Sequence, residues 1–174
     1  MALGQNTKGY ETPNHPYQGE RIDEESGLLG RYGLKNKEEL WRAQSELRSY
    51  RREARRLLGE AQGDAAAAER AGRDFLARLR RLDVLGETDQ LDDVLSLDVT
   101  DVLERRLQTV VYRKGLANTP KQARQFIVHG HVVVGESRVT VPSKKVDVDE
   151  ESRVRFDETS PLADELHPER AEEQ

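Results

Sequence analysis

The sequence predicts an α+β protein: an N-terminal helical domain, then a C-terminal unit in which two short helices pack on a small β-sheet. Two long stretches, 37–58 and 65–85, carry apolar residues at helical spacing. After residue 100 the helical patterns become shorter and give way to clusters of valine, which are typical of a β-hairpin. Hydrophobic residues make up only 35% of the 174 residues, so two small cores are expected rather than one large core.

The first 30 residues are expected to form an extended arm, because they contain Pro13, Pro16 and several glycines and show no apolar period. Disorder is the alternative for this stretch. Its acidic residues outnumber its basic ones, so its charge does not mark it as an RNA-binding tail.

The clearest helix is predicted over residues 37–58. Asn36 caps it and Glu39 stands at the third helical position. One arc of this helix is apolar and consists of Leu40, Ala43, Leu47, Tyr50, Ala54, Leu57 and Leu58. An adjacent arc carries five arginines with Trp41 near its centre. Trp41 is expected to pack at the helix base, and the alternative is a contact with RNA or a neighbouring protein.

A second helix is predicted over residues 65–85, begun by Asp64 and ended by Gly86. Its inner face consists of Ala68, Ala71, Phe75, Leu79 and Leu82. Residues 59–63 then form a turn that lets the two helices pack antiparallel. For residues 87–97 the sequence does not decide between a loop, a short helix and a strand.

The C-terminal unit is predicted to begin with two short helices. Thr100 caps the first helix, whose apolar face includes Val102, Leu103, Leu107, Val110 and Val111, and Gly115 ends it. Thr119 and Pro120 open the second helix, which Gly130 ends. Valines at 132–134, 139 and 141 predict a β-hairpin, with a further strand over 154–156.

This C-terminal unit is locally basic in an acidic chain. Residues 101–146 hold nine Lys and Arg against three acids, whereas the whole chain has a net charge of −5. The positive charge could simply belong to a solvated helix face. Both helices carry it, however, and this favours RNA as the partner. The candidate RNA-binding residues of both parts are Arg48, Arg51, Arg52, Arg55, Arg56, Arg105, Arg106, Arg113, Lys114, Thr119, Lys121, Arg124, Gln125, His129, His131, Arg138, Lys144 and Lys145.

The same segment resembles the S-four RNA-binding module. The matching stretches are 103–107, 110–113, 115–117, 123–125, 129–132 and 141–143. The stretches 10–17, 32–41, 44–48, 54–58 and 91–97 resemble the archaeal and eukaryotic form of the ribosomal protein S-four family. The resemblance runs in order from about Tyr10 to Phe156.

The resemblance implies a structural constituent of the small ribosomal subunit. Such a protein binds small-subunit rRNA directly, nucleates assembly of the subunit body and shoulder and contributes to translational accuracy. It implies a monomer within the cytoplasmic ribosome, with ribosomal protein S-five and other small-subunit proteins as neighbours and mRNA near the entry path. The expected domains are an extended N-terminal arm (1–30), a helical rRNA-binding domain (31–99), the S-four module (100–158) and a flexible acidic tail (159–174).

Other functional classes have less support. Residues 1–99 offer no phosphate-binding loop, cofactor glycine motif or catalytic triad, so no enzyme activity and no cofactor are expected. The chain contains no cysteine, and the His129–His131 pair lacks a third ligand at useful spacing, so no metal site is expected. No apolar run reaches membrane-spanning length. A nucleolar relative that acts in rRNA processing is the alternative function.

The composition resembles that of proteins from salt-accumulating halophilic archaea. Arginines outnumber lysines by 21 to seven, and residues 147–174 hold eleven acids against three arginines. At molar salt the Debye length is about 3 Å, so short bidentate arginine–phosphate contacts matter more than the diffuse field. An ordinary acidic tail is the competing explanation, and the nucleolar alternative fits this composition poorly.

Overall fold

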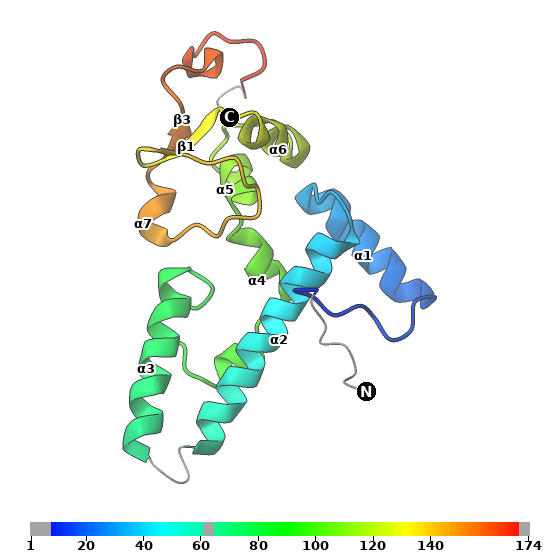
Figure 1. Ribbon diagram of the computed structural model, residues 1–174, viewed down its shortest axis with the longest axis vertical. Helices are drawn as coiled ribbons and strands as arrows, with labels where there is room; N and C mark the ends of the chain where they lie inside the picture. The colour runs from blue at the N-terminus through cyan, green and yellow to red at the C-terminus, as the bar shows by residue number, and fades with distance from the viewer. Residues whose placement is uncertain (1–7, 61–64, 171–174) are drawn as a thin grey trace.

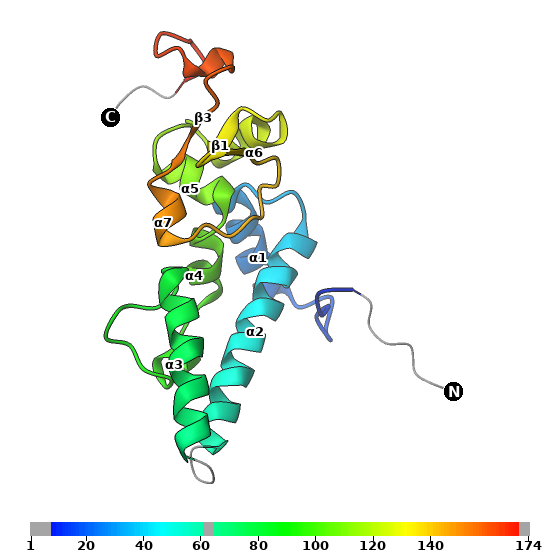
Figure 2. The same ribbon diagram turned by 60° about the vertical axis from the view of Figure 1, so that its left-hand side comes forward.

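The computed structural model describes residues 8–60 and 65–170 and has the predicted α+β architecture. A long pair of helices extends from one end of the molecule, and a smaller unit of helices and strands lies at the other end (Figures 1 and 2). The elements are α1 (Gly19–Tyr32), α2 (Lys37–Glu60), α3 (Ala65–Arg81), η1 (Asp93–Leu95), α4 (Val99–Glu104), α5 (Leu107–Arg113), α6 (Pro120–Val128), β1 (Val132–Val134), β2 (Ser137–Arg138), α7 (Val148–Glu151), β3 (Val154–Phe156) and η2 (Pro161–Ala163).

Helices α2 and α3 pack antiparallel, as predicted (Figure 1). The side chain of Asn36 accepts a hydrogen bond from the backbone N–H of Glu39 at 3.2 Å, which caps α2. The rings of Tyr50 and Phe75 meet at 6.5 Å between centroids. The predicted cap at Asp64 and most of the predicted turn lie outside the described residues.

The predicted end of α3 was wrong. The helix ends at Arg81, and Asp83 rather than Gly86 takes the left-handed conformation, with φ 52°. The backbone N–H of Val84 then donates to the carbonyl of Leu79 at 3.0 Å. This bond satisfies an end carbonyl of the helix, so the chain turns three residues earlier than the glycine suggested.

The prediction of an extended arm over residues 1–30 was wrong from residue 19 onward, where α1 forms. Residues 1–7 lie outside the described residues, and the segment before α1 contacts α2 through Tyr10 and Glu11. There the backbone N–H of Glu11 donates to the hydroxyl of Ser45 at 3.0 Å. Trp41 donates to the buried carboxylate of Glu25 at 3.1 Å and lies beside Tyr10. Trp41 therefore packs between α1 and α2, as expected for a tryptophan at the helix base.

The first predicted C-terminal helix is broken into α4 and α5 at Arg105 and Arg106. Arg106 is extended, with φ −77° and ψ 142°. The carbonyl of Arg105 accepts from the backbone N–H of Val146 at 3.0 Å, and the backbone N–H of Leu107 donates to the carbonyl of Lys144 at 2.8 Å. The loop after the sheet thus fills the break. Helix α4 is capped by Asp98 rather than by Thr100.

The predicted β-hairpin and third strand are present, but the second strand is Ser137–Arg138 and does not include the predicted Val139 and Val141, because the turn after β1 is only two residues long. Strand β1 lies between β2 and β3 and pairs antiparallel with both, with Val133 opposite Arg138 and Arg155. Gly135 makes the turn with φ 63°.

Buried apolar residues form two separate cores. The first runs from Tyr32 to Leu103 and belongs to the helical half, which we define as residues 19–103. The second runs from Leu107 to Leu162 and belongs to the module, which we define as residues 105–170. The break at Arg105 and Arg106 lies between the two cores. The low hydrophobic content predicted two small cores of this kind.

The acidic tail is docked, so the expectation of a flexible segment from residue 159 was wrong for residues 159–170. Leu162 is only 4% exposed and completes the module core. Ser160 hydrogen-bonds His131 at 2.9 Å, and Gln122 donates to the carbonyl of Glu169 at 2.9 Å. The guanidinium of Arg170 lies 5.7 Å from the ring centre of Phe156. Apolar and polar contacts together therefore hold the tail on the module.

Candidate nucleic-acid interface

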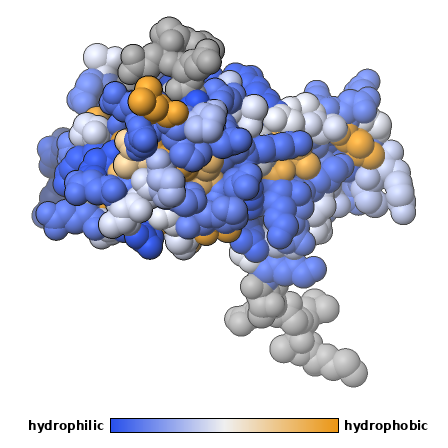
Figure 3. Space-filling view, turned by 90° about the horizontal axis from the view of Figure 1, so that it is seen from above, coloured by the Kyte–Doolittle hydropathy of each residue, from blue (hydrophilic) through white to orange (hydrophobic). Residues whose placement is uncertain are grey.

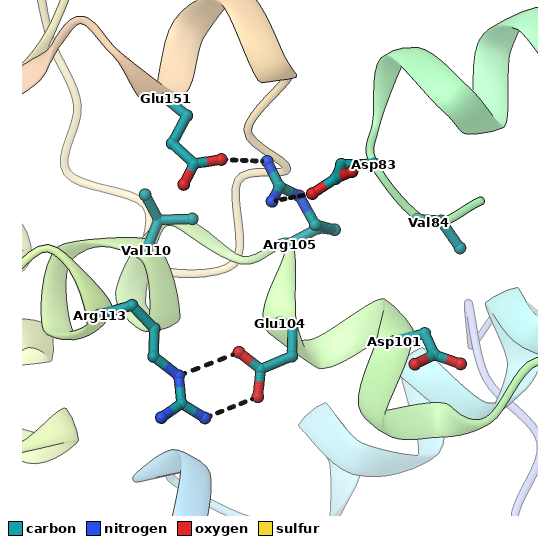
Figure 4. A pocket seen from close by; sticks show the side chains of 8 residues that line it. All are labelled: Asp83, Val84, Asp101, Glu104, Arg105, Val110, Arg113 and Glu151. Atoms are coloured by element: carbon teal, nitrogen blue, oxygen red, sulfur yellow. Dashed lines mark hydrogen bonds and ion pairs between the residues drawn. The ribbon is translucent and has the colours of Figure 1, made fainter. Parts of the chain in front are cut away.

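Two of the predicted RNA-binding arginines are buried inside the protein. Arg105 is 7% exposed and Arg106 is 4% exposed. Figure 4 shows Arg105 between two carboxylates, donating to Asp83 at 3.0 Å and to Glu151 at 2.7 Å. Arg106 donates to Glu39 at 2.7 Å. The expectation that Arg106 lies on an open basic surface is therefore wrong, because its charge is used within the fold.

Five further predicted cations are exposed or half-buried but tied to groups of the chain itself. Their partners are Glu104 for Arg113, the carbonyls of Glu151 and Val154 for Lys114, Asp157 for Arg138, Glu150 for Lys144 and Glu46 for Lys145. Figure 4 shows the two parallel bonds by which Arg113 grips Glu104. The four carboxylate partners neutralise part of the positive charge at the surface of the module, whereas Lys114 keeps its charge but not its freedom to move.

The outer side of α6 collects the open polar groups of the module. Lys121, Gln125 and His129 recur every fourth residue, so they lie along one side of the helix. All three are exposed, and within the described ranges 8–60 and 65–170 the side chains of Lys121 and Gln125 have no hydrogen-bond or ion-pair partner. His129 lies beside His131, with ring centres 6.1 Å apart. Thr119 caps the helix by accepting from the backbone N–H of Gln122 at 3.1 Å.

The five arginines of α2 differ in availability. Arg51 donates to the carbonyl of Leu97, Arg48 pairs with Glu11 at 3.3 Å, and Arg56 pairs with Glu53 and Glu60. The side chains of the other two arginines, Arg52 and Arg55, are exposed and make no ion pair or hydrogen bond with any other described residue. The arginine arc is thus reduced to two open guanidinium groups.

Arg124 belongs neither to the exposed side of α6 nor to the exposed arginines of α2. It donates to both carboxylate oxygens of Glu39, at 2.6 and 3.2 Å, and to the side chain of Gln108 at 3.3 Å. Glu39 and Gln108 are central residues that the sequence did not single out. The sequence marks Glu39 only as the third residue of the predicted helix, in a capping position. Gln108 is a fully buried polar residue within an apolar helical face, and this interruption of the pattern was the available signal.

Ion pairs and burial both shift pKa values in this region. Burial alone would raise the pKa of Glu39, but hydrogen bonds from Arg124 and Arg106 lower it below its ordinary value. Burial likewise opposes the lowering of the pKa of Glu104 by Arg113 and Tyr32. Burial lowers the pKa of Lys145, against the attraction of Glu46, and burial also lowers that of His131.

Acid is therefore expected to destabilise the protein. Because the pKa values of Glu39 and Glu104 are lowered in the folded state, their contribution is complete above the ordinary value of 4.5 and is lost as the pH falls through the lowered values. Thermal unfolding followed from about pH 6 to about pH 3 should show the loss of stability below pH 4.5. A melting temperature that stayed constant over this range would contradict the assignment.

Nothing in the described part of the chain favours a metal or membrane site. Residues 8–60 and 65–170 contain no group of three or more His, Asp or Glu side chains able to hold a metal ion. Within the same ranges, no helix combines the length and apolar character that crossing a bilayer requires.

Comparison with known proteins identifies the family. The S4 domain model matches residues 105–152, which start at the break between α4 and α5. The chain is 75% identical over 174 residues to small ribosomal subunit protein uS4 of Natronomonas pharaonis, covering 100% of both chains. It is 71% identical to the protein of that name from Haloarcula marismortui, covering 100% of this chain and 99% of the relative. The identity is 50% to that of Methanococcus aeolicus, over 95% of this chain and 93% of the relative.

These relatives confirm the family resemblance found in the sequence, and the first two come from halophilic archaea, as the composition indicated. Because the likeness spans the whole chain and far exceeds what a shared module alone would give, the protein belongs to the small ribosomal subunit protein uS4 family.

Proposed function

We propose that this protein is a structural constituent of the small ribosomal subunit that binds small-subunit rRNA directly. The observation that carries the proposal is the S4 domain within a full-length likeness to small-subunit proteins. A structural role rather than a catalytic one follows from the same family membership. Hydrophilic side chains cover most of the face seen in Figure 3, and apolar groups are small and scattered, as suits a polar partner.

We propose two rRNA contacts. One is the outer side of α6, with Lys121, Gln125 and His129, and the other is the pair Arg52 and Arg55 on α2. Their support is that these side chains are exposed while most other predicted cations are tied to groups of the chain itself. Phosphate contacts by such cations supply position and affinity. The deep major groove of A-form RNA is closed to side chains, so the shape of the rRNA would supply selectivity.

The more specific roles rest on the family resemblance. Contacts with ribosomal protein S-five and other small-subunit proteins, a place near the mRNA entry path, early action in subunit assembly and an influence on decoding accuracy are proposed on that basis. So is a cytoplasmic, ribosome-bound location as a monomer. Co-sedimentation with mature small subunits after a high-salt wash tests the ribosome-bound location against the nucleolar alternative.

The α2 contact can be tested by its salt dependence. Arg52→Ala with Arg55→Ala should weaken binding to a small-subunit rRNA transcript and lower the slope of log affinity against log salt by roughly 0.7–0.9 for each phosphate that is no longer neutralised. The matched control is Arg56→Ala with Arg73→Ala, which removes two charges that already pair with Glu53, Glu60 and Glu69. If Arg52→Ala with Arg55→Ala kept the affinity and salt slope of the parent protein, this pair would be removed from the interface.

A further inference from the structure

Glu39 joins the helical half to the module. It lies in the first turn of α2, and its carboxylate accepts from Arg106 at 2.7 Å and from Arg124 at 2.6 and 3.2 Å. The side chain of Glu39 is only 18% exposed and that of Arg106 only 5%. Arg106 stands just before α5 and Arg124 stands within α6. One carboxylate therefore binds the start of α5 and the middle of α6 at once.

Other polar contacts extend this junction. The buried amide nitrogen of Gln108 donates to the carbonyls of Tyr32, Gly33 and Pro120 at 3.2, 2.9 and 2.8 Å. Lys145 pairs with Glu46 of α2 at 3.2 Å. We call Glu39, Arg106, Gln108, Arg124 and the Glu46–Lys145 pair the seam.

The seam matters because the two halves have separate apolar cores. The first core ends at Leu103 and the second begins at Leu107. Apolar packing is non-directional, and within each core it stabilises only that half. Bidentate ion pairs and fixed amide hydrogen bonds are directional, and partly buried pairs are screened by salt much less than exposed ones. The seam, together with the ion pairs Arg105–Asp83 and Arg81–Asp147, can therefore fix the angle between the halves, and Glu39 is the member that binds two arginines of the module.

We propose that Glu39 is a positioning residue for RNA binding: it fixes the module relative to α2, so that the exposed polar side chains on α6 and the exposed arginines on α2 meet rRNA in one preset geometry. Arg106 and Arg124 serve this orientation instead of contacting phosphate. This inference rests on the proposed rRNA-binding function. Binding energy would otherwise be spent on ordering the two halves, because only molecules in the competent orientation bind well.

Glu39→Gln provides a test in which the direction of the change in RNA affinity is informative. It removes a negative charge while keeping the shape of the side chain, so simple electrostatics predicts equal or tighter binding of RNA. If positioning dominates and about one variant molecule in ten has the competent orientation, binding to a small-subunit rRNA transcript weakens about tenfold. The matched control is Glu38→Gln, which removes the same charge from the neighbouring exposed residue. Glu39→Gln binding as tightly as Glu38→Gln, or more tightly, overturns the proposal.

A double-mutant cycle separates positioning from direct contact. Arg124→Gln should weaken binding by no more than Glu39→Gln, because Arg106 keeps its bond to Glu39, and the double variant should be no worse than Glu39→Gln alone. Additive losses would mean that Arg124 contacts rRNA on its own, which overturns its assignment to the seam. If the parent protein fails to prefer this transcript over poly(U), the rRNA function fails instead.

The orientation itself can be measured without RNA. The chain has no cysteine, so spin labels can be placed cleanly at Ser49→Cys on α2 and Glu136→Cys in the module turn, both exposed positions. The distance distribution should be narrow in the parent and in Glu38→Gln, and broad in Glu39→Gln. Circular dichroism first establishes that Glu39→Gln is folded, and Arg124→Gln repeats the measurement from the module side. A narrow, unchanged distribution in folded seam variants overturns the proposal.

Discussion

Gly33→Ala is expected to destabilise the protein by about 2–5 kcal/mol, from a left-handed backbone that alanine disfavours and from overpacking. Gly33 ends α1 with φ 59°. A methyl group there would lie 2.9 Å from the amide nitrogen of Gln108 and 2.9 Å from the backbone carbonyl carbon of Pro120. The backbone of Pro120 cannot move aside like the end of a flexible side chain, so the contact between α1 and α6 should open.

Denaturant unfolding of the parent and two glycine variants measures this effect. The control is Gly27→Ala, at an exposed position in the middle of α1, where an added methyl group meets nothing within 4 Å. Because alanine is the better helix former, Gly27→Ala should stabilise the protein by roughly 0.5–1 kcal/mol. Gly33→Ala should also weaken rRNA binding, since Gln108 holds the carbonyl of Gly33 in the seam. A Gly33→Ala variant as stable as the parent would show that the junction tolerates a side chain.

Folding of the free protein is expected to require high salt. The chain has a net charge of −5, and its acids cluster in residues 57–100 and 147–174. Exposed ion pairs contribute little, whereas repulsion among clustered carboxylates weakens as the Debye length falls from about 10 Å at 0.1 M to about 3 Å at 1 M. Lowering KCl from molar to physiological levels should therefore partly unfold the protein, seen by circular dichroism as a lower melting temperature.

The tail offers a matched variant for this measurement. Glu165→Gln with Glu169→Gln removes two exposed charges from the docked segment and should reduce the salt requirement. Glu53→Gln with Glu60→Gln removes the same number of charges but leaves Arg56 without its partners, so it should not help. A parent melting temperature independent of KCl would contradict the halophilic interpretation and leave the family assignment intact.

Local patterns predicted α2 and the sheet, missed α1 and the break between α4 and α5, and predicted the pairing of charges poorly. The α2 helix and the hairpin of β1 and β2 depend on residues close in sequence, so spacing and caps were enough. The partner of Arg124 is 85 positions away and that of Arg106 is 67 positions away, and no local rule relates them. A count of basic residues therefore described the charge of the module correctly but not its open surface.

The same distinction explains the errors at the two ends of the chain. Residues 19–32 resemble part of an arm in sequence because their few apolar side chains are interrupted by acids and glycines. The helix they form is held by Trp41 and Lys37 of α2, which bind the buried Glu25. The charge of the tail suggests flexibility, but the tail is docked by the buried Leu162 and by polar contacts such as that between Ser160 and His131.

The place of Leu162 in the module core has a consequence during synthesis. The helical half has its whole core once Leu103 has left the exit tunnel, whereas the module lacks a core residue until Leu162 follows. At about 5–20 residues per second, that interval lasts roughly 3–12 s. During it, a finished N-terminal half carries α5 and α6 with their apolar sides incompletely covered. The nascent chain is then most open to wrong association, and a stop codon placed before residue 162 would leave it permanently in that state.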